Sequence, residues 1–238
     1  MDAAEIGMRW LPLALIAIPG DASAQMLRDD FERGLCVGSC RGAPWAITQE
    51  ENGRVRVAAA PGRPGRALLA ETGPKRGGVA KADVVARTRF LPAGTLVAIA
   101  FDLHVPRGTP LDSLQLVDVE CASCGEGGNP GVRLYLRRGR LRIDRSKIGT
   151  RHAWTRDDAP QLVAGRWHRI VWRLRLGVGD DGTAGVTLDG REVLRATGAT
   201  LAPLPRLGAD RVQIGITANS NPVPARVWFD NVSVTIAR

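Results

Sequence analysis

The stretch RWHRIVWRLRL, residues 166–176, alternates between two kinds of side chain and decides the fold class. One face of an extended chain carries His168, Ile170, Trp172, Leu174 and Leu176. The other face carries Trp167, Arg169, Val171, Arg173 and Arg175. A period of two over this length predicts a β-strand with one packed face and one largely cationic face.

The same alternation recurs along much of the chain. It appears at residues 132–136 and 141–143, with Arg138-Gly139 as the expected hairpin tip, and around Asp189-Gly190, a dipeptide that tolerates a type I′ turn. Further strands are expected at residues 54–59, 79–90, 95–105, 113–120, 211–217 and 225–236. About a dozen antiparallel strands with few helical patterns predict an all-β fold, a jelly-roll β-sandwich of two curved sheets.

The first residues have the features of a secretory leader. Arg9 precedes an apolar run at residues 10–18, which is followed by Pro19-Gly20 and by the small residues 22–24. We expect residues 1–24 to be a signal peptide and residues 25–238 to be a single jelly-roll domain, secreted or periplasmic and monomeric. No other segment approaches the length of a transmembrane helix.

Composition limits the class of partner. The 238 residues include 33 Lys and Arg against 24 Asp and Glu, a formal net charge of +9, and 44% of them are apolar. This composition excludes a coiled coil, a collagen and a wholly disordered chain. A cationic surface favours an acidic partner, and the leader together with the moderate charge argues against nucleic acid.

Four cysteines form two close pairs, Cys36 with Cys40 and Cys121 with Cys124. In an exported protein, four cysteines predict two disulfides, and we favour local pairing within each pair. The alternative is a zinc site with four thiolate ligands, which belongs mainly to reducing compartments.

Several motifs carry a resemblance to a known family. Residues 162–171, followed by the GTAGVTLDGREV stretch at 182–193, resemble the late strands of concanavalin A-like jelly rolls. The ending VWFDNVSV at 227–234 is similar to the closing strand of that superfamily, and residues 30–32 resemble its opening strand. The order of the segments resembles secreted polysaccharide lyases of the heparin, alginate and glucuronan type.

The resemblance to these lyases is incomplete at their catalytic motifs. Lys81-Ala-Asp83-Val84 stands in place of their R-x-E-L strand. Gln115 matches the first residue of their Q-x-H strand, but Val117 stands where the His belongs. In the K-x-G-x-Y strand, Gln213 replaces Lys and Thr217 replaces Tyr. Eliminative cleavage of a uronate needs a neutralised carboxylate, a base and an acid, and Val and Thr cannot supply the last two.

The remaining candidates for an acid or base are few. Tyr135 shares a strand face with arginines that would lower its pKa, and His152 lies in a loop-like segment, where binding residues gather. Tyr135 is alternatively an aromatic anchor of the sheet. His168 is expected to be a hydrogen-bonded core residue and His104 a surface residue.

The candidate substrate-binding residues follow from the same strands. They are Lys81, Asp83, Arg87, Gln115, Arg133 and Arg137. We expect Lys81 and Arg87 to flank a substrate carboxylate while Asp83 orients a cation. Arginines at 133–142 and 169–175 are expected to line one concave face and to hold uronate or sulfate groups. The alternative is that these rows form a solvated outer surface.

Calcium is the one cofactor that the sequence suggests. Asp30 near the start and Asp230 in the closing strand, with Asp29 and Glu32 nearby, supply hard oxygen ligands that paired terminal strands would bring together. The alternative is plain surface charge, and no other cofactor is expected.

Three functions remain open from the sequence. The first is a secreted carbohydrate-binding protein that engages an acidic polysaccharide, uronate or sulfated, through a cationic groove. The second is an active lyase that cleaves a uronate polymer by β-elimination, with Tyr135 or His152 as acid or base. The third is a structural or adhesive envelope module.

Overall fold

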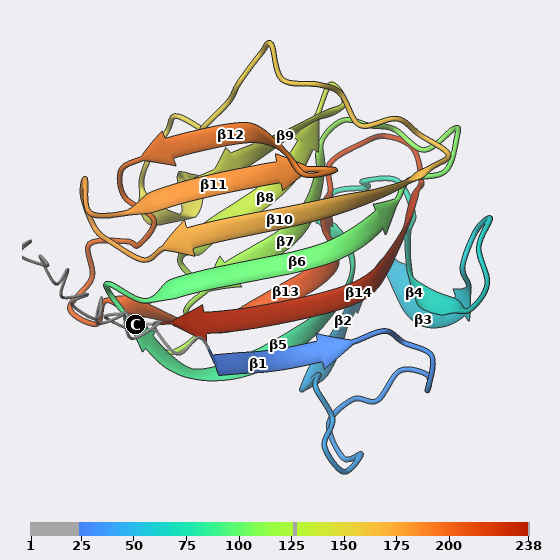
Figure 1. The fold of residues 1–238 in the computed structure, drawn as a ribbon, viewed down its shortest axis with the longest axis horizontal. Helices are drawn as coiled ribbons and strands as arrows, with labels where there is room; N and C mark the ends of the chain where they lie inside the picture. The colour runs from blue at the N-terminus through green and yellow to red at the C-terminus, as the bar shows by residue number, and fades with distance from the viewer. Residues whose placement is uncertain (1–23, 126–127, 238) are drawn as a thin grey trace, which may run out of the picture.

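The computed structural model describes residues 24–125 and 128–237, which form two antiparallel sheets packed face to face (Figure 1). The larger, eight-stranded sheet has the order β12 (Arg191–Thr197), β11 (Thr183–Leu188), β10 (Trp167–Arg175), β6 (Leu96–His104), β14 (Ala225–Ala237), β4 (Arg66–Thr72) and β3 (Gly53–Ala59). Its eighth strand, β1 (Ala24–Asp29), pairs with β14. This architecture confirms the predicted all-β jelly roll.

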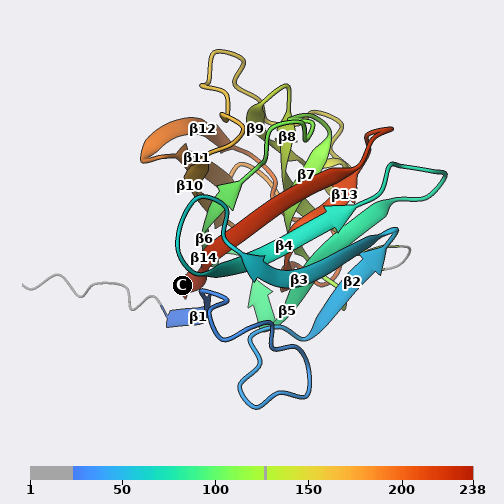
Figure 2. The same ribbon diagram turned by 90° about the vertical axis from the view of Figure 1, so that its right-hand side faces the viewer.

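The smaller, six-stranded sheet lies behind the larger one in Figure 1. Its order is β2 (Ile47–Glu51), β5 (Ala80–Pro92), β13 (Gly208–Asn219), β7 (Leu114–Glu120), β8 (Gly131–Arg137) and β9 (Arg140–Asp144). A short 3₁₀ helix, η1 (Ser146–Ile148), follows β9. Figure 2 shows β2, β3 and β4 at one side of the sandwich.

The core lies between the two sheets. On β10 the predicted packed face is confirmed, because Ile170, Trp172 and Leu174 are all buried while Arg173 and Arg175 are exposed. Side chains of the six-stranded sheet that point toward the eight-stranded sheet, for example Val84 and Ile214, complete the same core. Side chains that alternate with these core residues point away from the partner sheet.

Both expected hairpin tips are confirmed. Arg138 and Gly139 have φ values of 51° and 73°, and Asp189 and Gly190 have φ values of 51° and 80°. Two consecutive positive φ values are what a type I′ turn requires.

The opening strand differs from the expectation. β1 ends at Asp29, and the prediction of a strand at residues 30–32 is wrong because Phe31 adopts a positive φ of 56°. The Asp29 carboxylate accepts the Phe31 N–H at 2.9 Å and closes this turn, which seats the Phe31 ring 6.2 Å from the ring of Trp45.

The cysteine prediction is confirmed for one pair only. Cys121 and Cys124 form a disulfide, which leaves too few thiolates for the alternative four-cysteine zinc site. Cys36 and Cys40 are free thiols, so the predicted second disulfide is wrong for this structure. The turn between them aims the Cys40 thiol at the Val37 carbonyl, 3.8 Å away, and not at Cys36.

The predicted leader, residues 1–24, lies outside the described residues except for Ala24, the first residue of β1. Within the described residues, no helix has the length and apolar character needed to cross a membrane.

Candidate functional site

The candidate site is the face of the six-stranded sheet that points away from the eight-stranded sheet, here called the polar face. It carries all six candidate binding residues. Its described polar members include Gln49, Lys81, Asp83, Arg87, Gln115, Asp118, Glu120, Arg133, Tyr135, Arg137, Arg140, Arg142, Asp144, Arg211, Gln213 and Thr217. Strand pairing brings them together from segments that are far apart in the sequence.

A β-bulge in β7 sets which residues of that strand reach the polar face. Gln115 lies opposite Tyr135 of β8, but the register then shifts, so that Asp118 lies opposite Arg133. Leu116 and Val117 are both fully buried in the core. The residue that follows Gln115 on the polar face is therefore Asp118, and Val117, at the position of the lyase His, is not on this face.

Asp83 is a buried carboxyl at the centre of the face. With the Gln49 amide turned so that its nitrogen faces these oxygens, Gln49 donates to Asp83 Oδ1 at 3.2 Å and to Gln213 Oε1 at 2.8 Å. Asp83 Oδ2 has no hydrogen-bond partner among the described residues. Burial, with a further contribution from the nearby Asp118, raises the pKa of Asp83 to about 8.

Two more carboxyls lie beside it on β7. Asp118 accepts a hydrogen bond from the Thr217 hydroxyl at 2.8 Å, and burial together with the charge of Glu120 raises its pKa to about 7. Glu120 accepts hydrogen bonds from Gln213 and from the ammonium group of Lys147. At neutral pH this layer therefore holds fewer negative charges than its three carboxyls suggest.

The arginines at the far side of the face are largely neutralised. Arg133 donates to Gln115 Oε1 at 3.2 Å and pairs with Asp144, and Arg142 pairs with Asp157 at 2.9 Å. Because of these pairs, the centre of the face is a closed hydrogen-bonded network and not an open cationic row.

Three further cations stand at the rim. Arg87 and Arg137 are exposed, Lys81 is half-buried, and none of the three has an ion pair within the described ranges. Arg87 lines a pocket of about 310 Å³ together with Arg211 and Ile47.

Two expectations about these residues are wrong. Lys81 and Arg87 are six residues apart on β5, about 20 Å along a strand, so they cannot flank one carboxylate. The arginine rows do not share one concave face either. Arg133 lies on the six-stranded sheet, whereas Arg173 lies on the outer face of the opposite sheet.

The two candidate catalytic residues are separate. Tyr135 is half-buried on the polar face, and burial raises the pKa of its phenol even though Arg142 and Arg137 act against the shift. The expectation of a lowered pKa is therefore wrong, and the phenol keeps its proton at neutral pH. His152 is exposed in the segment after η1, and the structure gives its ring no hydrogen bond to Tyr135 or to any other described residue.

The other two histidines are structural. His168 is buried, with its Nδ1 2.8 Å from Asp189 and its Nε2 3.1 Å from the Val163 carbonyl, as expected for a core histidine. His104 is also buried, with its ring between Trp167 and Trp228, so the surface position expected for it is wrong.

The residues suggested for calcium do not fit a metal site. Asp230 pairs with Arg63, and Asp30 accepts the backbone N–H of Glu32 at 3.2 Å. Asp29 accepts the indole N–H of Trp45 at 2.7 Å. Among the residues that the structure describes, no three His, Cys, Asp or Glu side chains are grouped closely enough to hold a metal ion.

Sequence reasoning missed Gln49, Asp118 and Glu120. In β2 only Gln49 is half-buried and the other four residues are exposed, so no alternation of apolar and polar residues marks this strand in the sequence. Asp118 and Glu120 did leave a signal: the consecutive apolar residues Leu116-Val117 break the period of two, which is the pattern of a bulge.

Comparison with solved structures shows which known proteins share this fold. The endo-β-1,4-glucuronan lyase of the fungus Trichoderma reesei superposes with a TM-score of 0.65 at 20% identity, covering 80% of this chain and 90% of the lyase. The cellulose-induced protein Cip1 has a TM-score of 0.60 at 15% identity, with 89% and 96% covered. Alginate lyase Aly36B has a TM-score of 0.58 at 11% identity, with 93% and 98% covered.

No protein-family model matches the sequence, and no curated protein matches it significantly. At these identities the likeness shows the fold, a polysaccharide-lyase-like jelly roll, and not the activity.

Proposed function

We propose that this protein is a secreted carbohydrate-binding protein that holds an acidic polysaccharide along the polar face. The observation that carries the proposal is the arrangement of charge on that face. The unpaired cations Lys81, Arg87 and Arg137 stand at its rim, around a centre whose own charges are already paired. Rim cations without internal partners are available to the carboxylate or sulfate groups of a polymer.

Two further observations support this reading. Gln115 of β7 and Arg133 of β8 hold each other in place, so an amide and a guanidinium are pre-oriented on the strand that also carries Arg137 or next to it. The neighbours of known activity include lyases named for glucuronan and for alginate, both acidic polysaccharides, on the same fold. The Cys121–Cys124 disulfide is typical of proteins in an oxidising compartment, such as the outside of the cell, where polysaccharides are accessible.

The test is affinity electrophoresis at low salt in gels that contain alginate, glucuronan or heparin. We expect retardation on at least one polymer and a loss of retardation as salt screens the exposed cations. If the protein migrates freely on all three polymers, the proposal is wrong.

Cleavage by β-elimination is the second candidate, favoured by Asp118. This carboxyl occupies the next polar-face position after Gln115, has a pKa near neutrality, and lies across from the strand that carries the protonated Tyr135. Asp118 is 3% exposed, so a substrate must displace covering side chains to reach it. Ultraviolet absorbance from an unsaturated uronate product, lost in Asp118→Asn, is the discriminating measurement; a flat trace with retained retardation supports binding alone.

The third candidate, a structural or adhesive envelope module, predicts neither signal. Retardation without an unsaturated product supports the binding protein over the structural module. Formation of that product supports the lyase.

A further inference from the structure

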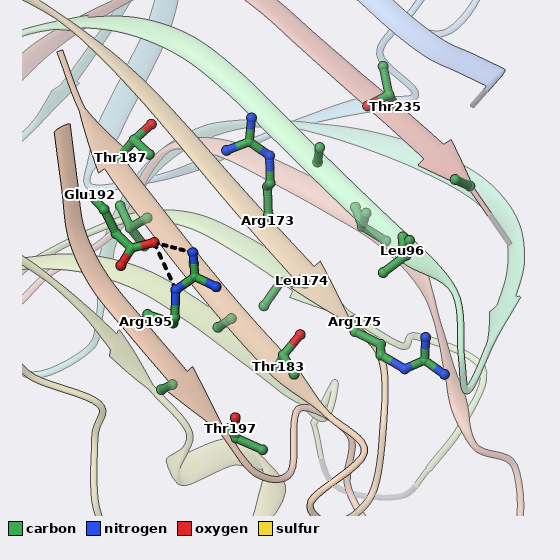
Figure 3. Close-up of a pocket in the computed structure, with 17 residues that line it drawn as sticks. Leu96, Arg173, Leu174, Arg175, Thr183, Thr187, Glu192, Arg195, Thr197 and Thr235 are labelled. Carbon is green, nitrogen blue, oxygen red and sulfur yellow. Dashed lines mark hydrogen bonds and ion pairs between the residues drawn. The ribbon is translucent and has the colours of Figure 1, made fainter. Parts of the chain in front are cut away.

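A groove of about 500 Å³ lies on the outer face of the eight-stranded sheet, on the opposite side of the sandwich from the polar face (Figure 3). Its walls and floor come from β14, β6, β10, β11 and β12. The groove therefore crosses five neighbouring strands, a span of roughly 19 Å at the usual strand spacing. No residue of the polar face contributes to it.

Strand register explains why the surface is hollow here. Arg173 of β10 lies between Ala98 of β6 and Gly185 of β11, and Thr235 of β14 lies next to Ala98. These neighbours are short, so they leave space on both sides of the Arg173 side chain. At Gly185, a Cβ atom would have no heavy atom within 4 Å, so the groove is open above this residue.

The charges in the groove are mainly positive and partly uncompensated. Arg173 and Arg175 are exposed, and neither has an ion pair with any residue in the described ranges. Arg195 pairs with Glu192 at 2.6 Å, and this glutamate is the one acidic residue among the described lining residues. Figure 3 shows the Arg195–Glu192 pair on one side and the arginines of β10 on the other.

The uncharged lining is suited to sugar. Hydroxyl groups come from four threonines, which are Thr183, Thr187, Thr197 and Thr235. Short apolar side chains such as Ala98 and Ala237 lie between them and offer surface for the C–H groups of sugar rings. The lining residues that the structure describes include no aromatic ring on which a nucleobase would stack.

We propose that this groove is a second binding site, which takes one chain of an anionic polysaccharide across β10. Arg173 and Arg175 bind its carboxylate or sulfate groups, and the threonine hydroxyls bind its ring hydroxyls. Arginine suits this role because its guanidinium donates two parallel hydrogen bonds to either anion. The site shares its ligand class with the polar face but depends on none of its residues.

The experiment uses three variants of the full chain. Arg173→Gln with Arg175→Gln removes the two free charges, and Gly185→Val fills the groove without any change in charge. Arg41→Gln with Arg54→Gln is the matched control, because both residues are exposed, have no ion pair with any described residue and lie outside the groove. All are made in an Arg87→Gln background, so that binding at the polar face is weakened in every sample.

Dissociation constants for alginate and heparin oligosaccharides are measured by calorimetry at low salt, with melting temperatures as the check on folding. We expect about tenfold weaker binding for the double arginine variant and for Gly185→Val, and a change below about twofold for the control. Equal losses in the control and the double arginine variant, or full binding by Gly185→Val, overturn the proposal.

A separate binding measurement tests whether the ligand of the groove is a glycan. If a single-stranded oligonucleotide binds as tightly as the oligosaccharides, and Gly185→Val weakens its binding to the same extent, the groove is a nucleic-acid site and the assignment to a glycan is overturned. Weaker binding by Arg87→Gln than by the unmodified protein, with no further weakening in the groove variants, rejects the groove and leaves the polar-face proposal intact.

Discussion

Gly215 of β13 lies directly opposite Asp83 of β5, and the absence of a side chain at Gly215 is what allows the two strands to approach there. A Cβ atom on Gly215 would lie 2.6 Å from Asp83 Cα and 2.4 Å from the Ala82 carbonyl oxygen, and Gly215 has a φ of 145°. The buried carboxyl at the centre of the polar face therefore depends on this glycine.

We expect Gly215→Ala to lower the free energy of unfolding by about 2 kcal/mol or more, because backbone atoms must move to relieve the contact. Urea denaturation measures the change. Gly185→Ala is the matched control, since its Cβ would meet open space, and it should be neutral or slightly stabilising. Equal effects of the two substitutions would contradict the close approach.

The pH dependence of stability follows from Asp83 and Asp118. Their folded pKa values, about 8 and about 7, lie above the value near 3.9 of an unfolded Asp. Between these values the folded state binds more protons than the unfolded state, so the free energy of unfolding falls as pH rises from about 5 to about 8. We expect a loss on the order of a few kcal/mol over this range.

Asp83→Asn provides the control for this prediction, since an amide imitates the protonated carboxyl and cannot ionise. The free energy of unfolding of the variant should fall less than that of the parent as pH rises, and the variant should be more stable than the parent above pH 8. A flat profile in the parent from pH 5 to pH 8 is the result that would count against raised pKa values.

The sequence predicted the fold well wherever strands alternate cleanly. β10, β8 and the two hairpins are examples, because one face of each strand packs on the core and the other does not. It missed β4, whose residues Ala67–Ala70 are all buried, since a continuous apolar run carries no period of two.

The site was less predictable, for two physical reasons. The bulge at Leu116 moves Asp118 onto the face, and a bulge changes which side chains share a face without changing composition. The sheet to which each arginine row belongs is decided by long-range pairing, in which β10 joins β6 while β8 joins β7. Local alternation contains no information about these partners.

The state of Cys36 and Cys40 is directly measurable. We expect protein purified without reductant to show two reactive thiols, and four after unfolding in reductant, because only Cys121 and Cys124 are joined. Cys36 should react slowly near pH 8, since its hydrogen bond to Cys40 helps to raise its pKa to about 11 and thiolate is the reactive form. Thiol titration of the native sample, and of a sample unfolded in reductant that is removed before the titration, gives the counts; no reactive thiol in the native sample would indicate the second disulfide.

The last prediction concerns Arg87, the rim cation beside the 310 Å³ pocket of the polar face. Its side chain is exposed, so Arg87→Gln should weaken polysaccharide binding by less than about 1 kcal/mol, a factor of two to five. Gln115→Ala should have a larger effect than its neutral charge suggests, because it removes one of the contacts that orient Arg133. Gln115 Oε1 accepts from Arg133 Nη1 at 3.2 Å, whereas Asp144 holds only the other guanidinium nitrogen. Arg191→Gln, an exposed arginine in the β11–β12 hairpin, is the charge-matched control. Affinity electrophoresis on the polymer that binds best compares the three. If Arg191→Gln weakens binding as much as Arg87→Gln while Gln115→Ala has no effect, diffuse electrostatic attraction accounts for the binding and the polar face is not the site.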